Sequence, residues 1–260
     1  MQHYGIIGYP LHHSFSARYF NEKFEREQIE AEYSLYPIDK GEWTNGRKDE
    51  CRGEGLNKGE GRKVIGDKIK ELINRLDGMN VTFPYKQAVI PYLNHLDETA
   101  ATIGAVNVIR KGVGYNTDCL GFMASIRPLL RKDDRKALVL GTGGAAKAVC
   151  YGLNKLGIAP TLVSRTPKDG VLGYNELTDD VMATHTIIVN CTPLGMLPDV
   201  DSFPPIPYEK ITARHLLFDC VYNPEETLFL SKGKAQGATI RNGMEMLIGQ
   251  AEEAWKIWTR

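Results

Sequence analysis

The sequence predicts an α/β protein with two domains, and three observations lead to this prediction. The chain has 260 residues, enough for one large domain or two modest ones. Short apolar segments alternate with longer amphipathic ones, as expected of parallel strands joined by helices. A second series of this kind begins after a charged run at residues 131–136, so we place a domain boundary between residues 116 and 135.

In the first series, apolar residues mark short strands. The strands are expected at residues 4–8, 32–38, 79–82 and 106–110. Helices are expected at residues 17–29, near 68–73 and over 86–96. Residues 40–63 are half charged and rich in glycine, so they cannot bury enough surface to form a core. We expect a long solvated loop or partly disordered insertion there, with a binding lid as the alternative.

The second series begins with a linking helix at residues 118–130, and we expect the charged run at 131–136 to be a solvated turn. Strands are expected at residues 137–140, 161–163, 186–189, 216–218 and 238–240. Further helices are expected at residues 145–156 and 244–258.

Composition excludes several function classes. Thirty-two Lys and Arg residues balance 32 Asp and Glu residues, so the chain lacks the basic excess that nucleic acids and anionic membranes attract. No apolar run approaches the roughly 18 residues of a membrane helix, and the first residues do not resemble a signal peptide. The five cysteines are odd in number and include no Cys-x-x-Cys pair, so we expect a cytoplasmic protein without a zinc or redox motif.

A glycine-rich loop follows the first strand of the second series. The segment Gly141-Thr142-Gly143-Gly144-Ala145-Ala146 matches the G-x-G-x-x-G/A dinucleotide fingerprint and precedes a predicted helix. In such a loop the first glycine permits the tight turn, and the second lets the backbone approach a pyrophosphate. We therefore predict that residues 141–145 bind the phosphates of a dinucleotide at the start of the helix.

The next strand ends at Ser164-Arg165-Thr166. NAD-binding units carry an acidic residue near this point for the ribose 2′-hydroxyl, and none is present here. The Arg165 guanidinium instead suits a 2′-phosphate, and Ser164 and Thr166 offer hydroxyl groups. We therefore predict NADP as the cofactor, with an arginine in a plain surface turn as the alternative.

Several short motifs, taken in order, resemble those of shikimate dehydrogenases. They are GYPLHHSFS at residues 8–16, GMNVTFPYK at 78–86, GAVN at 104–107, GYNTD at 114–118, the glycine loop, NCTPLGM at 190–196, DCVY at 219–222 and GMEMLIGQA at 243–251. The resemblance implies NADPH-dependent, reversible reduction of 3-dehydroshikimate to shikimate, a step of aromatic amino-acid biosynthesis. The alternatives are a quinate/shikimate dehydrogenase of broader specificity and a non-catalytic NADP or ligand sensor on the same scaffold.

The resemblance also implies a domain arrangement. Residues 1–116 would form a substrate-binding domain, joined by residues 241–260 as the last helix returns to it. Residues 117–240 would form a Rossmann NADP-binding domain, with the active site in the cleft between the domains. We expect a monomer or homodimer.

Two residues are expected to carry the chemistry. Reduction of a ketone leaves an alkoxide that needs a proton, and Lys86 can donate it or hold the oxygen by a charged hydrogen bond. Asp118 would orient Lys86 and bind a substrate hydroxyl. Taken singly, Lys86 could be a solvated lysine and Asp118 a helix cap.

The remaining site residues follow from the same resemblance. Ser14 and Ser16 look like a clamp for the substrate carboxylate, with a helix-capping role for Ser14 as the alternative, and Tyr222 is a third contact. Thr82, Asn107 and Gln250 resemble the family's partners for substrate oxygens. Cys220 and Gly243 match positions at the nicotinamide end. Glu98 is a candidate near the cofactor or an ordinary helix-surface residue. Asn80 is expected to tie its strand to a neighbouring loop, and we treat His12 and His13 as loop residues without a metal.

Overall fold

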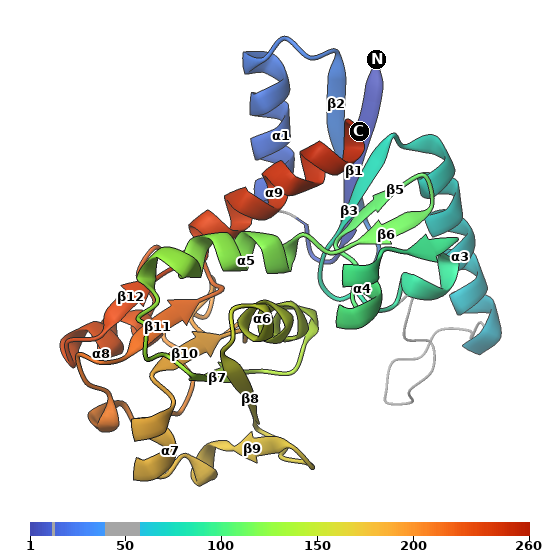
Figure 1. Ribbon diagram of the computed structural model, residues 1–260. Helices are drawn as coiled ribbons and strands as arrows, with labels where there is room; N and C mark the ends of the chain where they lie inside the picture. Colours follow the sequence, from blue (N-terminus) through green and yellow to red (C-terminus); the bar gives the residue numbers. More distant parts are fainter. Residues whose placement is uncertain (12–13, 40–57) are drawn as a thin grey trace. The chain divides into compact units, whose positions relative to one another are not determined.

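The computed structural model describes residues 1–11, 14–39 and 58–260 (Figure 1). The chain divides into two compact units, one formed by Met1–Asn116 with Ala254–Arg260 and the other by Thr117–Glu253. Within the described residues each unit contains one six-stranded sheet, so the predicted α/β class is confirmed. None of the helices in these ranges has both the length and the apolar character that a membrane crossing requires.

The first unit is a mixed sheet in the order β2-β1-β3-β5-β6-β4. Its strands are β1 (Gln2–Gly8), β2 (Ala31–Pro37), β3 (Gly78–Val81), β4 (His95–Leu96), β5 (Val108–Arg110) and β6 (Val113–Tyr115). Its helices are α1 (Phe15–Arg26), α3 (Lys58–Arg75) and α4 (Glu98–Ile103). Strand β1 pairs in parallel with both β2 and β3, so the loops that follow β1 and β3 leave the same edge of the sheet.

The end of the last helix, α9 (Met244–Trp258), packs into the first unit. The Trp258 ring stacks on Tyr4 with centroids 5.0 Å apart, and its indole N–H donates to the carbonyl of Ile109 at 3.2 Å. A Cβ on Gly78 would overlap the same ring, so only glycine lets β3 approach the indole. The predicted return of the C-terminal helix to the first domain is confirmed for the end of this helix, whereas residues 241–253 belong to the second unit.

Two sequence predictions for this unit are wrong. Residues 86–96 do not form a helix but a series of turns, the short 3-10 helix η1 (Ile90–Tyr92) and strand β4. Pro91 lacks the amide that a continuing helix needs, and the Lys86 carbonyl already accepts the Val106 amide at 2.7 Å. Residues 58–63 begin helix α3 rather than continuing a loop, whereas residues 40–57 lie outside the described part of the chain.

The second unit is a parallel sheet in the order β12-β11-β10-β7-β8-β9. Its strands are β7 (Lys136–Leu140), β8 (Ala159–Ser164), β9 (Val171–Gly173), β10 (Ile187–Asn190), β11 (Leu216–Asp219) and β12 (Thr239–Arg241). Its helices are α5 (Asp118–Ile126), α6 (Gly144–Lys155), α7 (Asp179–Thr184), α8 (Leu228–Ala235) and the first part of α9. The five predicted strands are present, while β9, α7 and α8 were not predicted.

This strand order is that of a Rossmann fold. The chain runs outward from β7 through β8 to β9 and then returns to β10 on the other side of β7. The carboxyl ends of β7 and β10 therefore form the point where the winding reverses, which is where open α/β sheets bind ligands. The glycine loop follows β7 at this point.

Both faces of the second sheet are covered. Ala137 and Val139 of β7 belong to one apolar cluster with Phe122 of α5 and Val149 of α6. The alternate residues of β7 belong to the opposite cluster, with side chains of α7 and α8. Strand β7 is thus apolar on both sides, as expected of a central parallel strand.

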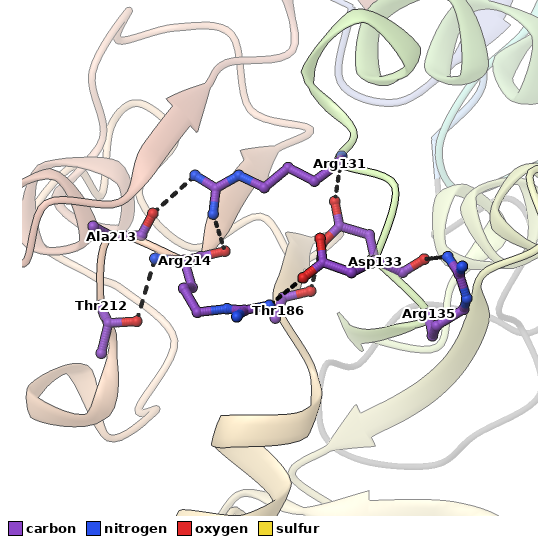
Figure 2. A network of polar contacts seen from close by, with 8 residues as sticks. Arg131, Asp133, Arg135, Thr186, Thr212, Ala213 and Arg214 are labelled. Atoms are coloured by element: carbon purple, nitrogen blue, oxygen red, sulfur yellow. Dashed lines mark hydrogen bonds and ion pairs between the residues drawn. The ribbon is translucent and has the colours of Figure 1, made fainter.

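The prediction of a solvated turn at residues 131–136 is wrong, because part of this charged run is buried and hydrogen-bonded to neighbouring segments. Figure 2 shows its polar contacts at the amino end of the second sheet. The guanidinium of Arg131 donates to the carbonyls of Ala213 and Arg214 at 2.9 and 3.2 Å. Asp134 is buried and accepts the Arg131 amide at 2.8 Å and the Thr186 hydroxyl at 2.6 Å. The run therefore fastens the turn before β7 to the start of β10.

A second polar network holds the carboxyl ends of β10 and β11. Asp219 is fully buried and accepts the amide of Val221 at 2.9 Å, the Asn190 side chain at 3.0 Å and the Thr227 hydroxyl at 2.6 Å. The Asn190 side-chain oxygen in turn accepts the Thr192 amide at 3.0 Å. Burial raises the pKa of Asp219 to about 7, although the three donors oppose this shift.

Replacing Asp134 by alanine is expected to lower the free energy of unfolding by about 1–3 kcal/mol, because a buried hydroxyl and a backbone amide lose their acceptor. The neighbouring Asp133→Ala removes an exposed ion pair with Arg214 and should lower the free energy of unfolding much less. Urea denaturation of both variants checks this. Equal losses in the two variants would contradict a structural role for Asp134.

The raised pKa of Asp219 predicts a pH-dependent stability. Between pH 3.8 and about 7 the folded protein keeps a proton on this carboxyl that the unfolded chain releases. The contribution is therefore fully present below pH 3.8 and is lost as the pH rises through about 7, by at most about 1.4 kcal/mol per pH unit. Asp219→Asn keeps a side chain of the same shape but cannot titrate. The difference in unfolding free energy between wild type and variant should therefore follow this slope. A pH-independent difference would refute the assignment.

Candidate active site

Strands β1 and β3 of the first unit bring Gly8 and Thr82 together. The Thr82 amide donates to the Ile7 carbonyl at 2.9 Å, and the Tyr9 amide donates to the Phe83 carbonyl at 3.0 Å. A Cβ on Gly8 would overlap the Thr82 methyl group, so glycine is needed for this approach. Thr82 therefore lies at the edge of the sheet from which the loop to Ser14 also leaves.

Lys86 lies in the turns that follow β3 and is half-buried. Its carbonyl accepts the Val106 amide at 2.7 Å. The preceding Tyr85 is fully buried and donates its hydroxyl proton to the Ile38 carbonyl at 2.6 Å. These bonds fix the backbone on both sides of the lysine, so its position is set by the fold even though the segment is not helical.

Asn107 directly precedes strand β5. Its carbonyl accepts the Val81 amide at 2.9 Å and the Asn80 side-chain amide at 3.2 Å, and its own amide donates to the Tyr115 carbonyl at 3.0 Å. Asn80 thus ties its strand to the neighbouring loop, as predicted. Thr82, Lys86 and Asn107 therefore belong to one hydrogen-bonded region of the first unit.

Ser14 and Ser16 differ in their surroundings. Ser14 occupies the N-cap position of α1, but its side chain makes no capping hydrogen bond. Ser16 is buried and hydrogen-bonds Tyr33. The single Tyr33 hydroxyl proton goes to the Asn80 side-chain oxygen at 2.7 Å, so Ser16 is the donor to Tyr33. Burial raises the pKa of Tyr33 well above its ordinary value, with the Ser16 hydrogen bond opposing that shift.

Glu98 is exposed in the first turn of α4, directly after the capping residue Asp97. An acidic side chain is favourable at that end of a helix, which suits the helix-surface alternative. A cofactor role for Glu98 stays a prediction. His12 and His13 lie outside the described residues.

In the second unit, the glycine loop has the geometry that a dinucleotide phosphate needs. Gly141 has a φ of +106°, which side-chain-bearing residues rarely adopt. A Cβ on Gly143 would meet nothing within 4 Å, so the backbone there is open to a close ligand. Gly144 begins α6, whose first amides lack intrahelical partners. The residues present therefore fit a pyrophosphate at the start of α6.

The carboxyl end of β8 carries Ser164, Arg165 and Thr166. Arg165 and Thr166 are exposed, and the Ser164 hydroxyl accepts the Thr166 amide at 3.3 Å. The positive charge of Arg165 is felt by Tyr174, where it opposes the rise in pKa that burial causes. Arg165 thus presents its guanidinium on the strand next to the glycine loop, where an adenosine 2′-phosphate would lie in a Rossmann fold.

Cys220 and Gly243 lie together at the carboxyl end of β11. The Gly243 amide donates to the Val221 carbonyl at 3.1 Å, and a Cβ on Gly243 would overlap the Cys220 carbonyl. Tyr222 follows in the same loop and is half-buried. Cys220, Tyr222 and Gly243 therefore share one corner of the second unit.

Asp118 and Gln250 lie on packed helices, α5 and α9. Asp118 is buried in the first turn of α5. The preceding Thr117 donates its hydroxyl proton to the Gln250 carbonyl at 2.9 Å. A Cβ on Gly121 would stand 2.8 Å from the Gln250 amide nitrogen, so this glycine permits the close packing of the two helices.

The predicted residues therefore fall into two groups. Ser14, Ser16, Thr82, Lys86, Glu98 and Asn107 belong to the first unit, and the cofactor loop, Asp118, Tyr222 and Gln250 belong to the second. The pairing of Lys86 with Asp118 stays a prediction. Within residues 1–11, 14–39 and 58–260, no three His, Cys, Asp or Glu side chains gather as metal ligands would.

Sequence reasoning missed the residues that support these groups. Tyr33 links Ser16 to Asn80, and Asn190 and Asp219 join the loops after β10 and β11. A polar residue at the end of an apolar strand was the available signal for Asn190 and Asp219. Tyr33 gave no such signal, because it resembles the other apolar residues of its strand.

Comparisons with known proteins agree with this arrangement. A family model described as the shikimate dehydrogenase substrate binding domain matches residues 6–109. The shikimate dehydrogenase (NADP(+)) of Methanosphaera stadtmanae is 33% identical, over 98% of this chain and 90% of the relative. The protein of the same name from Clostridium beijerinckii is 38% identical, over 99% of this chain and 92% of the relative.

A solved structure is similar over the whole chain. Shikimate 5-dehydrogenase of Thermus thermophilus, in complex with NADP(H) and shikimate, has a TM-score of 0.81 and 27% identity. The comparison covers 100% of this chain and 94% of that one. The identity and coverage of the curated relatives confirm the resemblance that the motifs indicated, and the chain belongs to the shikimate dehydrogenase family.

Proposed function

We propose that the chain catalyses the NADPH-dependent, reversible reduction of 3-dehydroshikimate to shikimate, a step of aromatic amino-acid biosynthesis. The observation that carries this proposal is the near full-length similarity to relatives named shikimate dehydrogenase (NADP(+)). The glycine loop between β7 and α6 supports it. We further propose that it acts as a monomer or homodimer in the cytoplasm.

Residues 141–145 would hold the cofactor's pyrophosphate at the start of α6, and Arg165 would hold the 2′-phosphate. The open backbone at Gly143 and the exposed guanidinium of Arg165 support this placement. Ser164 and Thr166 would contact the adenosine ribose, and Cys220 and Gly243 would line the nicotinamide end. When bound, NADPH supplies the hydride that reduces the substrate ketone.

Lys86 would handle the proton of the reaction. Its ammonium Nζ can donate a proton to the oxygen that gains charge as the ketone is reduced, and the neutral amine can accept that proton in the reverse direction. Asp118 would hold the lysine in place and bind a neighbouring hydroxyl of the ring. The fixed backbone around Lys86 and the burial of Asp118 support these roles, because both side chains start from set positions.

The substrate carboxylate and hydroxyls need further donors. Ser14 suits the carboxylate, since its hydroxyl does not cap α1. Ser16 can join the clamp when its proton turns from Tyr33 to the substrate, and Tyr222 would be the third contact. Thr82, Asn107 and Gln250 would bind the remaining oxygens. The shared hydrogen-bonded region of Thr82, Lys86 and Asn107 supports this grouping.

A spectrophotometric assay tests the proposal as a whole. The purified chain should reduce NADP when shikimate is supplied, seen as growth of the NADPH absorbance band. Parallel assays with quinate and with NAD address the broader-specificity alternative, for which those pairs should react comparably well. Binding of NADP without turnover would instead favour a sensor and overturn the proposal.

Lys86→Ala is expected to lower turnover by about 10²–10⁴-fold, the usual contribution of a proton-transfer group, with a modest change in ligand affinity. Lys70→Ala, which removes an exposed lysine from α3 of the same unit, should keep wild-type turnover. Steady-state kinetics with shikimate and NADP measure both variants. Unchanged turnover in Lys86→Ala would remove this lysine from the mechanism.

Arg165→Ala is expected to raise the Michaelis constant for NADPH by about 10–100-fold, since hydrogen bonds to a charged group contribute about 1.5–3 kcal/mol. The constant for NADH should change little, because NADH has no 2′-phosphate. Lys168→Ala, an exposed cation in the same loop, serves as the control. Equal changes in the Michaelis constants for NADPH and NADH in Arg165→Ala would show that this arginine does not bind the 2′-phosphate.

A further inference from the structure

Two cysteine thiols meet at the carboxyl edge of the second sheet. Cys191 directly follows β10 and Cys220 directly follows β11, and the Sγ atoms lie 3.7 Å apart. The strands are parallel neighbours whose last paired residues are Asn190 and Asp219. The Cys220 amide donates to the Asn190 carbonyl at 2.9 Å, which continues the ladder to the two cysteines.

The strand geometry suits a bond between these sulfurs. Neighbouring strands lie about 4.8 Å apart, within the roughly 4.4–6.8 Å range of Cα separations that disulfides span. The sulfurs are in contact but not bonded, because a disulfide bond is about 2.05 Å long. Both cysteines are free thiols and both are half-buried. To bond, the sulfurs would have to approach from 3.7 Å to about 2.05 Å.

We propose that Cys191 and Cys220 form a modification site that closes to a disulfide in the presence of a hydroperoxide, and that this closure inhibits the enzyme. One thiolate attacks the peroxide, whose O–O bond breaks to give a sulfenic acid and release hydroxide or alkoxide. The second thiol then attacks the sulfenic sulfur, so that the S–S bond forms, the S–O bond breaks and water leaves. The two thiols are oxidised by two electrons, and the peroxide is reduced by the same two.

The groups around Cys191 set the speed of this reaction. Burial raises the pKa of the Cys191 thiol well above its ordinary value, and the neighbouring Cys220, Cys150 and Asp219 act in the same direction. Burial also raises the pKa of Cys150, on α6, to about 11. Because the thiolate is the attacking form, closure should be slow at neutral pH and faster in alkaline buffer.

The inhibition rests on the proposed function, whereas bond formation does not. Closing the gap from 3.7 Å to about 2.05 Å moves the side chains of the two residues that directly follow Asn190 and Asp219. A Cβ on Gly243, at the predicted nicotinamide end, would overlap the backbone carbonyl of one of them, Cys220. Displacements of about 1 Å near reacting groups can cost about 10²-fold in rate. We therefore expect kcat/KM to fall by about 10–100-fold in the oxidised protein.

The test treats the full chain with hydrogen peroxide, blocks the remaining thiols with an alkylating reagent and maps cross-linked peptides by mass spectrometry. Wild-type protein and Cys150→Ser should both yield a peptide pair joined through Cys191 and Cys220. Cys191→Ser should not yield it. Each variant's activity is compared before and after oxidation, and again after dithiothreitol.

The proposal requires a Cys191–Cys220 link, a loss of activity that dithiothreitol reverses, and protection of Cys191→Ser from that loss. Absence of the link, or a link to Cys150, would overturn the site. A link with unchanged activity, or equal inactivation of Cys191→Ser, would overturn the inhibition. If the unoxidised chain lacks shikimate-dependent activity, the proposed function fails separately, and peptide mapping still decides whether the dithiol closes.

Discussion

The hydrogen bonds that the buried Asp219 carboxyl accepts hold together the part of the second unit on which its proposed chemistry depends. This side chain accepts hydrogen bonds from Asn190, Val221 and Thr227, so one group joins the end of β10 to the loop after β11 and the start of α8. The strand order places β10 beside β7, where the glycine loop begins. A parallel sheet alone would align the strand ends but would leave their loops unconstrained, and Asp219 supplies that constraint.

The first unit reaches a similar result with neutral groups. Asn80 is buried, and its side chain accepts a hydrogen bond from the Tyr33 hydroxyl and donates one to the Asn107 carbonyl. One amide therefore links β2, β3 and the turn that precedes β5. In both units, some residues proposed to touch ligands, such as Thr82 and Tyr222, lie on loops after strand ends, and buried polar side chains behind them hold these parts of the chain in place. A buried network of this kind favours a single arrangement, because any unpaired member would be costly.

Sequence reasoning predicted the features that depend on local patterns. The strands of the second unit are apolar on both faces, and the glycine loop after β7 has a known fingerprint, so both were readable. The helix predicted over 86–96 was wrong because its apolar residues follow a helical spacing that Pro91 and a bond to Val106 override. Helix α4 could have been found, since Asp97 caps it and Gly104 ends it with a φ of +67°.

Contacts between distant residues were beyond the sequence, and the two cysteines illustrate why. Cys191 and Cys220 are 29 residues apart and form no Cys-x-x-Cys pattern, so the sequence predicted no redox motif. Strands β10 and β11 pair in parallel, so their carboxyl ends lie side by side, and the cysteines that directly follow these ends become neighbours. The same rule places Asp219 beside Asn190 one residue earlier. The Asn190–Asp219 pair, which stabilises the edge of the sheet, is thus directly followed along both strands by the Cys191–Cys220 pair, which we propose can be oxidised. The loops held in place by the first pair would therefore be strained by a disulfide in the second.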